Sequence, residues 1–308
     1  MKAFGYQQFG KPDVFEELNV ADAKITSDDQ VLVSTRAIGI NNFDRIQREG
    51  KIGGGEFPII PGRDVVGEVV KIGDNVSSVA VGDTVIGHAA PAYAQMVVIP
   101  ESRLVKKPVS VRNQVAAAII TPGITAYNAV TAFTHVRAGD RVLVNGATGG
   151  VGSIAVQVAK KLGAYVIGTG SSRNKDLLDE LPLDEVGFYD TENINERFAD
   201  SVDVVINAAM NGNNDTLISD VIRDGGRAAS VGNAANLTNK PKVIFEHIRP
   251  LDAQHDKLAL GELSSMLADG SLKMRIFKTL PLTLSGVIQG HQLLEEHHAP
   301  GRIILAND

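Results

Sequence analysis

The hydrophobic pattern of the chain changes character near residue 115. Before that point, short runs of apolar and β-branched residues alternate with Gly, Pro, Asp and Asn turn signals. Strands at this spacing, separated by such turns, are typical of a compact and mostly antiparallel barrel. The runs cover residues 31–33, 65–72, 84–86 and 96–99.

After about residue 115, the alanine-rich segment 114–130 begins a region in which strands and helices alternate. Residues 142–144 are a short buried-type strand, and apolar residues from 151 to 162 recur at the helical steps of three and four. Gly163 lies where a helix end favours a left-handed residue, and 165–167 is a second apolar strand. Together they predict one complete βαβ unit.

The same alternation continues toward the end of the chain. Residues 203–207 and 225–232 predict two further strands of the α/β region. The later segments are a covering helix at 258–267, a strand at 275–282, a helix at 284–296 and a strand at 302–305.

Two domains are therefore expected in an α/β chain of 308 residues, which is long enough for two full cores. The first is a β-barrel domain over residues 1–115, completed by 272–308. The second is a doubly wound parallel sheet of Rossmann type over residues 116–271.

The turn 146–152 has the properties of a phosphate-binding site. A pyrophosphate must approach the unpaired N–H groups that begin the following helix. Gly149 lets the backbone close on the phosphates, and Gly152 lets the helix pack near the strand. The motif is a variant, since Ala147 replaces its first glycine; an ordinary tight turn is the alternative. The predicted contacts are Ala147, Thr148, Gly149, Gly150 and Val151.

The segment after strand 165–167 bears on which cofactor binds. An acidic residue there would bond the adenosine ribose and select NAD, but the sequence has none at that position. Ser171, Ser172, Arg173 and Lys175 stand there, and hydroxyls with cations suit a 2′-phosphate. We predict NADPH; a solvated loop is the alternative. Ends of later strands, at Asn207, Ala208, Val231 and Asn233, should line the same crevice.

Composition narrows the function further. The formal charge is 30 − 36 = −6, which predicts no attraction to nucleic acid or to an anionic membrane. The chain has no cysteine, so disulfides, thiolate metal sites and a cysteine nucleophile are excluded. It has no apolar leader and no run of about 18 apolar residues, so a cytoplasmic protein is expected.

The chain resembles the zinc-independent quinone oxidoreductases of the medium-chain dehydrogenase/reductase superfamily, the group that includes zeta-crystallin. The resemblance implies a GroES-like catalytic domain, an inserted Rossmann domain, a cofactor in the cleft between them, and a homodimer or homotetramer. The segments that carry it are 39–44, 61–69, 81–85, 123–126, 145–152 and 301–305.

Zinc is not expected. In zinc-dependent members of the superfamily, a cysteine ligand falls at the position of Asn41 and a histidine ligand at that of Arg63. Asn is a poor zinc ligand and Arg has no free lone pair. His88 and the adjacent histidines at 297–298 remain, and the adjacent pair is interpreted as part of a polar surface and not as a metal site.

The resemblance implies hydride transfer from NADPH to a quinone without a metal. Enone or enal reduction and a non-catalytic NADPH-binding sensor or structural protein are the alternatives. Asn41 either donates to the acceptor oxygen or caps the preceding strand, and Asp44 orients its neighbours. Ile46 replaces a tyrosine that many members carry, which removes stacking surface and a proton donor. The resemblance also places Thr125 against the nicotinamide, Lys175 and Tyr189 at the adenosine end, and Val231 and Asn233 beside the cofactor.

Overall fold

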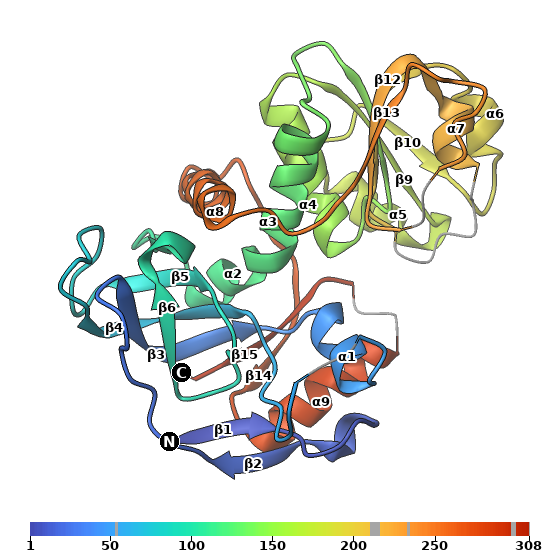
Figure 1. Ribbon diagram of the computed structural model, residues 1–308. Helices are drawn as coiled ribbons and strands as arrows, with labels where there is room; N and C mark the ends of the chain where they lie inside the picture. Colours follow the sequence, from blue (N-terminus) through green and yellow to red (C-terminus); the bar gives the residue numbers. More distant parts are fainter. Residues whose placement is uncertain (53–54, 210–215, 233–234, 297–299, 308) are drawn as a thin grey trace. The chain divides into compact units, whose positions relative to one another are not determined.

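Figure 1 shows the protein as a computed structural model, which describes residues 1–52, 55–209, 216–232, 235–296 and 300–307. Their contacts form two compact units. The first joins Met1–Thr121 with Asp252–Asp308, and the second is Pro122–Leu251. Among the described residues, no helix combines the length and the apolar character that a membrane crossing requires.

The first unit is organised around β3 (Gln30–Gly39), whose alternate residues are buried, as a half-buried strand requires. β3 pairs antiparallel with β4 (Asp64–Ile72), β6 (Met96–Pro100) and β15 (Arg302–Ala306). The end of the chain therefore lies beside its first long strand, red against blue in Figure 1. The sheet continues through β5 (Thr84–His88) and β7 (Leu104–Lys106) on one side and β14 (Ile276–Pro281) on the other.

Smaller elements close the first unit. β1 (Lys2–Gly5) and β2 (Glu16–Asn19) form a separate antiparallel pair. A hydrophobic core of aromatic and branched residues joins these strands to the sheet, with Phe4, Tyr6, Phe15 and Ile38 among its members. The other elements are η1 (Pro12–Val14), α1 (Asn42–Arg48), η2 (Glu101–Arg103), α2 (Asn113–Ala118), α8 (Ala253–Ala268) and α9 (Leu284–Glu295).

The expected domain limits need a correction at α8. The sequence predicts a helix at 258–267 that covers the second domain, and a helix does form there. It packs against η2 and β7, however, and its buried Asp256 accepts from His88 and Arg103 of the first unit. Contacts with residues distant in the sequence therefore place α8 in the first unit. The limits between the two units fall at 121/122 and 251/252.

The second unit holds a parallel sheet in the order β10-β9-β8-β11-β12-β13 within the described residues. β8 (Arg141–Asn145) lies between β9 (Tyr165–Gly170) and β11 (Val202–Asn207), so the strand order reverses there. Open α/β sheets bind ligands at such a switch point, at the carboxyl ends of their strands. The other strands are β10 (Glu185–Phe188), β12 (Ile222–Ser230) and β13 (Ile244–His247).

Periodicity predicts one of the helices that connect these strands. The helix expected after the glycine turn is α4 (Gly150–Lys161), and Gly163 takes the left-handed conformation at φ +83°. The α/β fold class, with a mostly antiparallel barrel and a doubly wound parallel sheet, is confirmed. The remaining elements are α3 (Ile120–Asn128), η3 (Ala129–Phe133), η4 (Ser172–Asn174), α5 (Lys175–Asp179), α6 (Ile194–Arg197) and α7 (Leu217–Val221).

Candidate functional site

The glycine turn is shaped so that the start of α4 stays open. Gly146 has φ +77°, and the N-cap residue Gly149 is extended and exposed. A Cβ on Gly152 would lie 2.2 Å from the Gly146 carbonyl oxygen, so only glycine lets the helix come this near. Gly149 has no side chain to cap the N–H groups of the first turn. The turn fits a pyrophosphate, because it offers backbone donors and a cradle that a side chain would fill.

The predicted turn residues have different environments. Thr148, Gly150 and Val151 are half-buried around the exposed Gly149, where a phosphate can reach them. Ala147 is fully buried, and its N–H is donated to the Thr169 carbonyl at 3.0 Å. Ala147 therefore ties the turn to β9 instead of presenting a donor to a ligand.

A chain of uncharged polar side chains crosses the carboxyl edge of the sheet. The Thr169 hydroxyl donates to Asn145 Oδ1 at 2.7 Å, and Asn145 Nδ2 donates to Asn207 Oδ1 at 2.9 Å. Asn207 Nδ2 then donates to Ser230 Oγ at 3.0 Å. These residues lie on β9, β8, β11 and β12, and we call them the carboxyl-edge chain. The chain fixes the strand ends relative to one another beside the glycine turn.

Of the four residues in the carboxyl-edge chain, the sequence analysis predicted only Asn207 as a site residue. A signal was present, because each of the others is a polar residue at or near the end of an apolar strand, as in VLVN and AAS. Ala208 and Val231 were also predicted to line the crevice. The Ala208 N–H donates to the Asn145 carbonyl and the Val231 N–H to the Asn207 carbonyl, both at 3.0 Å. Asn233 lies outside the described residues. Thr125 is half-buried in α3.

A carboxylate does lie at the end of β9, contrary to the sequence-based expectation. Asp190 follows β10, the strand that pairs with β9, and its side chain reaches the serines. It accepts from Ser171 Oγ at 2.7 Å, Ser172 N at 2.8 Å and Ser172 Oγ at 2.9 Å. Residue spacing along one strand cannot show a carboxylate that arrives from the next. We call residues 171–175 the serine loop.

The cations of the serine loop are exposed. The Lys175 ammonium pairs with Asp179 one helical turn later, and the ion pair raises the pKa of Lys175. Arg173 is exposed, and Tyr189 is 56% exposed beside the loop, with its N–H on the Gly170 carbonyl at 3.2 Å. The predicted 2′-phosphate ligands of the serine loop therefore lie next to Asp190, a carboxylate that the sequence analysis did not predict.

Asn41 and Asp44 lie at the start of α1 and are buried. The Asn41 N–H donates to Asp44 Oδ2 at 2.9 Å, and this is one of the two hydrogen bonds of a capping box. The Asn41 amide donates to Asp64 Oδ2 at 2.8 Å and to the Gly39 carbonyl at 3.3 Å, and its oxygen accepts from Arg302 at 2.8 Å. Both amide protons therefore have partners, of which the Gly39 contact is the weaker.

These residues belong to a larger buried polar cluster in the first unit. Asp64 also accepts from the Thr121 N–H at 3.1 Å, and the Tyr93 hydroxyl lies 3.4 Å from Asp44 and 3.2 Å from His291. We use the name buried polar cluster for Asn41, Asp44, Asp64, Tyr93, His291 and Arg302.

Burial dominates the protonation of the cluster. It raises the pKa of Asp44 from 3.8 to about 7, with the nearby Asp64 charge adding to the effect and the Asn41 N–H opposing it. Burial lowers the pKa of His291 from 6.5 to about 3, and the positive charge of Arg48 acts in the same direction. Asp44 is completely buried and accepts the Asn41 N–H, an arrangement that suits a residue that positions Asn41.

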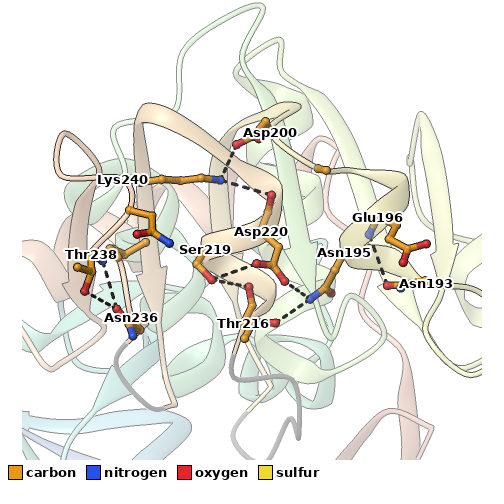
Figure 2. Close-up of a pocket in the computed structure, with 13 residues that line it drawn as sticks. Asn193, Asn195, Glu196, Asp200, Thr216, Ser219, Asp220, Asn236, Thr238 and Lys240 are labelled. Carbon is orange, nitrogen blue, oxygen red and sulfur yellow. Dashed lines mark hydrogen bonds and ion pairs between the residues drawn. The ribbon is translucent and has the colours of Figure 1, made fainter.

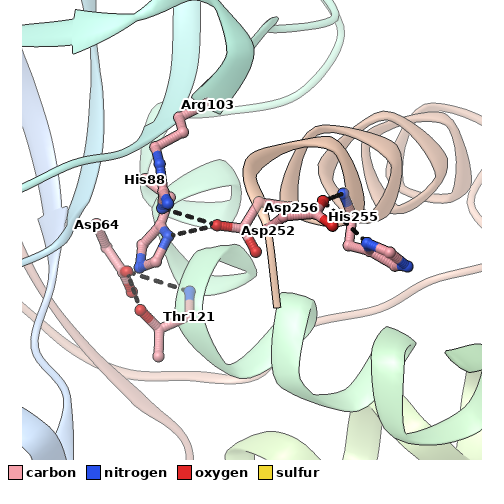
Figure 3. Close-up of polar contacts among 7 residues, drawn as sticks. All are labelled: Asp64, His88, Arg103, Thr121, Asp252, His255 and Asp256. Atoms are coloured by element: carbon pink, nitrogen blue, oxygen red, sulfur yellow. Dashed lines mark hydrogen bonds and ion pairs between the residues drawn. The ribbon is translucent and has the colours of Figure 1, made fainter. Parts of the chain in front are cut away.

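Arg63 and His88, two residues considered in the argument against zinc, contact other side chains of the first unit. The Arg63 guanidinium lies 4.3 Å from the centre of the Phe43 ring. His88 Nδ1 lies 3.1 Å from Asp256 Oδ2, a contact drawn in Figure 3. Within the described ranges, no group of three or more His, Cys, Asp or Glu residues is placed to bind a metal. The histidine pair at 297–298 lies outside the described residues.

Each unit also has a cavity. One, of about 870 Å³ in the second unit, is lined by polar groups that bond one another, such as Asn195 with Asp220 at 2.6 Å (Figure 2). It shares no residue with the predicted cofactor contacts. The other, of about 530 Å³ in the first unit, has Arg63, His88 and Arg103 in its lining.

Two family models match separate parts of the chain. Residues 27–109 match the family described as alcohol dehydrogenase GroES-like domain, and residues 150–253 match the family described as zinc-binding dehydrogenase. The first match falls within the first unit, while the second crosses from the parallel sheet into α8.

Individual relatives match over most of their length. The NADPH-dependent alkenal/one oxidoreductase of Arabidopsis thaliana is 29% identical over 99% of this chain and 79% of its own. The quinone oxidoreductase of Homo sapiens is 30% identical over 79% of this chain and 76% of its own. A solved structure of Escherichia coli quinone oxidoreductase complexed with NADPH is 25% identical, covers 100% of both chains and has a TM-score of 0.87.

Proposed function

The chain belongs to the quinone oxidoreductase-like family of medium-chain dehydrogenases/reductases, and from this premise we propose that it transfers hydride from NADPH to quinones. Its coarser activity, NAD(P)H-dependent oxidoreduction, follows from the family. The observation that carries the proposal is the open glycine turn at a switch point of the parallel sheet, where Gly149 leaves the first-turn donors of α4 uncapped.

The residues of the chain would act by binding and orienting. The cofactor, when bound, supplies the hydride. Thr148, Gly149 and Gly150 would hold its pyrophosphate, and Arg173 with Lys175 would hold its 2′-phosphate. Asn207, Ala208, Val231 and Asn233 would complete the pocket at the strand ends, with Thr125 at the nicotinamide and Tyr189 at the adenosine.

Asn41 is the group that can stabilise charge on the acceptor oxygen. Exchanging its 3.3 Å bond to Gly39 for a bond to the acceptor leaves its contacts with Asp64 and Arg302 intact. Asp44 fixes the Asn41 backbone and acts as a positioning residue. We propose that no metal takes part, because Asn41 and Arg63 stand where zinc ligands would be needed.

Enone or alkenal reduction is the second candidate, favoured by the 29% identity over 99% of the chain to a reductase of that class. Initial rates of NADPH and NADH oxidation, measured with a panel of quinones and enones, test both. We expect the highest kcat/KM with a quinone. A faster enone reaction favours the second candidate, and rates no higher than a cofactor-only blank contradict both and favour a non-catalytic NADPH-binding protein.

A further inference from the structure

Asp190 is an acceptor that occupies the donors of the serine loop. Its carboxylate receives the Ser172 N–H and the hydroxyl protons of Ser171 and Ser172, all within 2.9 Å. A serine hydroxyl has a single proton to donate. While Asp190 holds both protons, the two hydroxyls can offer a ligand only their oxygen lone pairs.

The same hydrogen bonds keep Asp190 ionised. The Ser172 N–H, followed by the Ser171 hydroxyl, lowers the pKa of Asp190 from 3.8 to about 2. A negative charge therefore stands at the end of β9 throughout the physiological pH range. The Lys175 ammonium is paired with Asp179. The serine loop therefore offers a ligand less net positive charge than its sequence alone indicates.

We infer that Asp190 is a specificity-determining residue that opposes the 2′-phosphate of NADPH and keeps NADH usable. The inference rests on the proposed function, which takes the serine loop as the adenosine end of the site. A phosphate there would meet a like charge and two hydroxyls without free protons, with Arg173 as its main attraction. A ribose 2′-hydroxyl meets no such repulsion and can donate to an acceptor.

The test replaces the charge but keeps an acceptor, in the variant Asp190→Asn of the full chain. Calorimetric titration with 2′,5′-ADP and 5′-AMP compares ligands that differ in the 2′-phosphate, and fluorescence titration with NADPH and NADH compares the whole cofactors. Since exposed charges are screened, we expect roughly tenfold tighter 2′,5′-ADP and NADPH binding, with 5′-AMP and NADH unchanged within about twofold.

A matched control tests whether the position of the charge matters. Asp184→Asn removes a carboxylate that accepts from Val166 N–H at the opposite end of β9, and should not alter the ratio of the two affinities.

Several results would overturn the inference. One is 2′,5′-ADP affinity that is unchanged or lower in Asp190→Asn while 5′-AMP binding is kept. Another needs no variant: a wild type that binds NADPH more than roughly a hundredfold tighter than NADH leaves no room for a repelling charge. A wild type that binds neither cofactor contradicts the proposed function as well, and so separates the two failures.

Discussion

The buried polar cluster of the first unit and the carboxyl edge of the second differ in how their polar groups are satisfied. The cluster combines the carboxyls of Asp44 and Asp64 with the Arg302 guanidinium in a nearly dry interior. The edge uses neutral side chains that bond one another in sequence, and beside them the first turn of α4 has no side-chain cap.

This difference suits the two regions to different roles: the buried polar cluster holds the structure in place, and the glycine turn can bind an anion. Charges that are buried and paired are costly to rearrange, so they hold neighbouring groups in fixed positions. Backbone donors without a cap stabilise an incoming anion without giving up an existing bond. We therefore expect changes in the cluster to alter stability, and changes at the glycine turn to alter cofactor affinity. Variants in each region test that separation.

The largest effect is expected from Arg302→Met. It removes the cation beside Asp64, and an unpaired buried carboxylate costs about 3–5 kcal/mol of unfolding free energy. Chemical denaturation measures this. The control is Arg36→Ala, which breaks an exposed pair with Glu68 and should cost less than about 1 kcal/mol. Equal costs for the two variants would show that the cluster is not a buried ionic centre.

Asp44→Asn should change the pH dependence of stability. The folded state holds the Asp44 proton more tightly than the unfolded state, because its pKa is about 7 against an ordinary 3.8. The unfolding free energy of the wild type should therefore fall, relative to the variant, by up to about 4 kcal/mol as pH rises from 4 to 7.

His291 acts with the opposite sign. Its pKa of about 3 in the folded state makes the unfolding free energy rise with pH up to about 6.5, in the wild type and the variant alike. The difference between the two proteins, measured by denaturation at several pH values, therefore isolates Asp44. A difference that does not depend on pH would contradict the raised pKa.

Gly149→Val should weaken cofactor binding while the fold survives. The extended N-cap conformation suits any residue, and a Cβ there meets only the Gly146 oxygen at 3.3 Å. The side chain fills the phosphate cradle, and losing two charge-assisted bonds should cost roughly 100-fold in NADPH affinity by fluorescence titration. Gly152→Ala is the matched contrast, since its Cβ lies 2.2 Å from backbone and should lower the melting temperature.

The smallest effect is expected at the exposed cations. Arg173→Ala should weaken NADPH by roughly three- to tenfold and NADH by less than twofold, because solvent screens its attraction to a phosphate. Lys175→Ala should weaken NADPH less, because Asp179 already pairs the Lys175 ammonium. Titration with both cofactors measures this, with Lys242→Ala as an exposed lysine control. Equal weakening of NADPH and NADH would show that the 2′-phosphate lies elsewhere.

The candidate site was predictable where it depends on neighbours along the chain. The turn 146–152, with its strand before and helix after, forms as the local pattern indicates. Most of the carboxyl-edge chain was missed, because Thr169, Asn145 and Ser230 become neighbours only through strand order and register. Sequence reasoning likewise left two roles open for Asn41, whose buried partners come from β3, β4 and β15.

By itself, the sequence determined the glycine turn with its flanking strand and helix, many of the other strands and helices, and the exclusion of cysteine chemistry, since each depends on residue type and short-range spacing. It did not predict the strands β1, β2, β10 and β13. Tertiary structure decided that α8 packs in the first unit and that Asp44 has a raised pKa. It also decided that Asp190 reaches the serines of the adjoining strand end. The physical reason is that packing, burial and charge proximity depend on distance in space, which strand pairing sets and linear spacing does not.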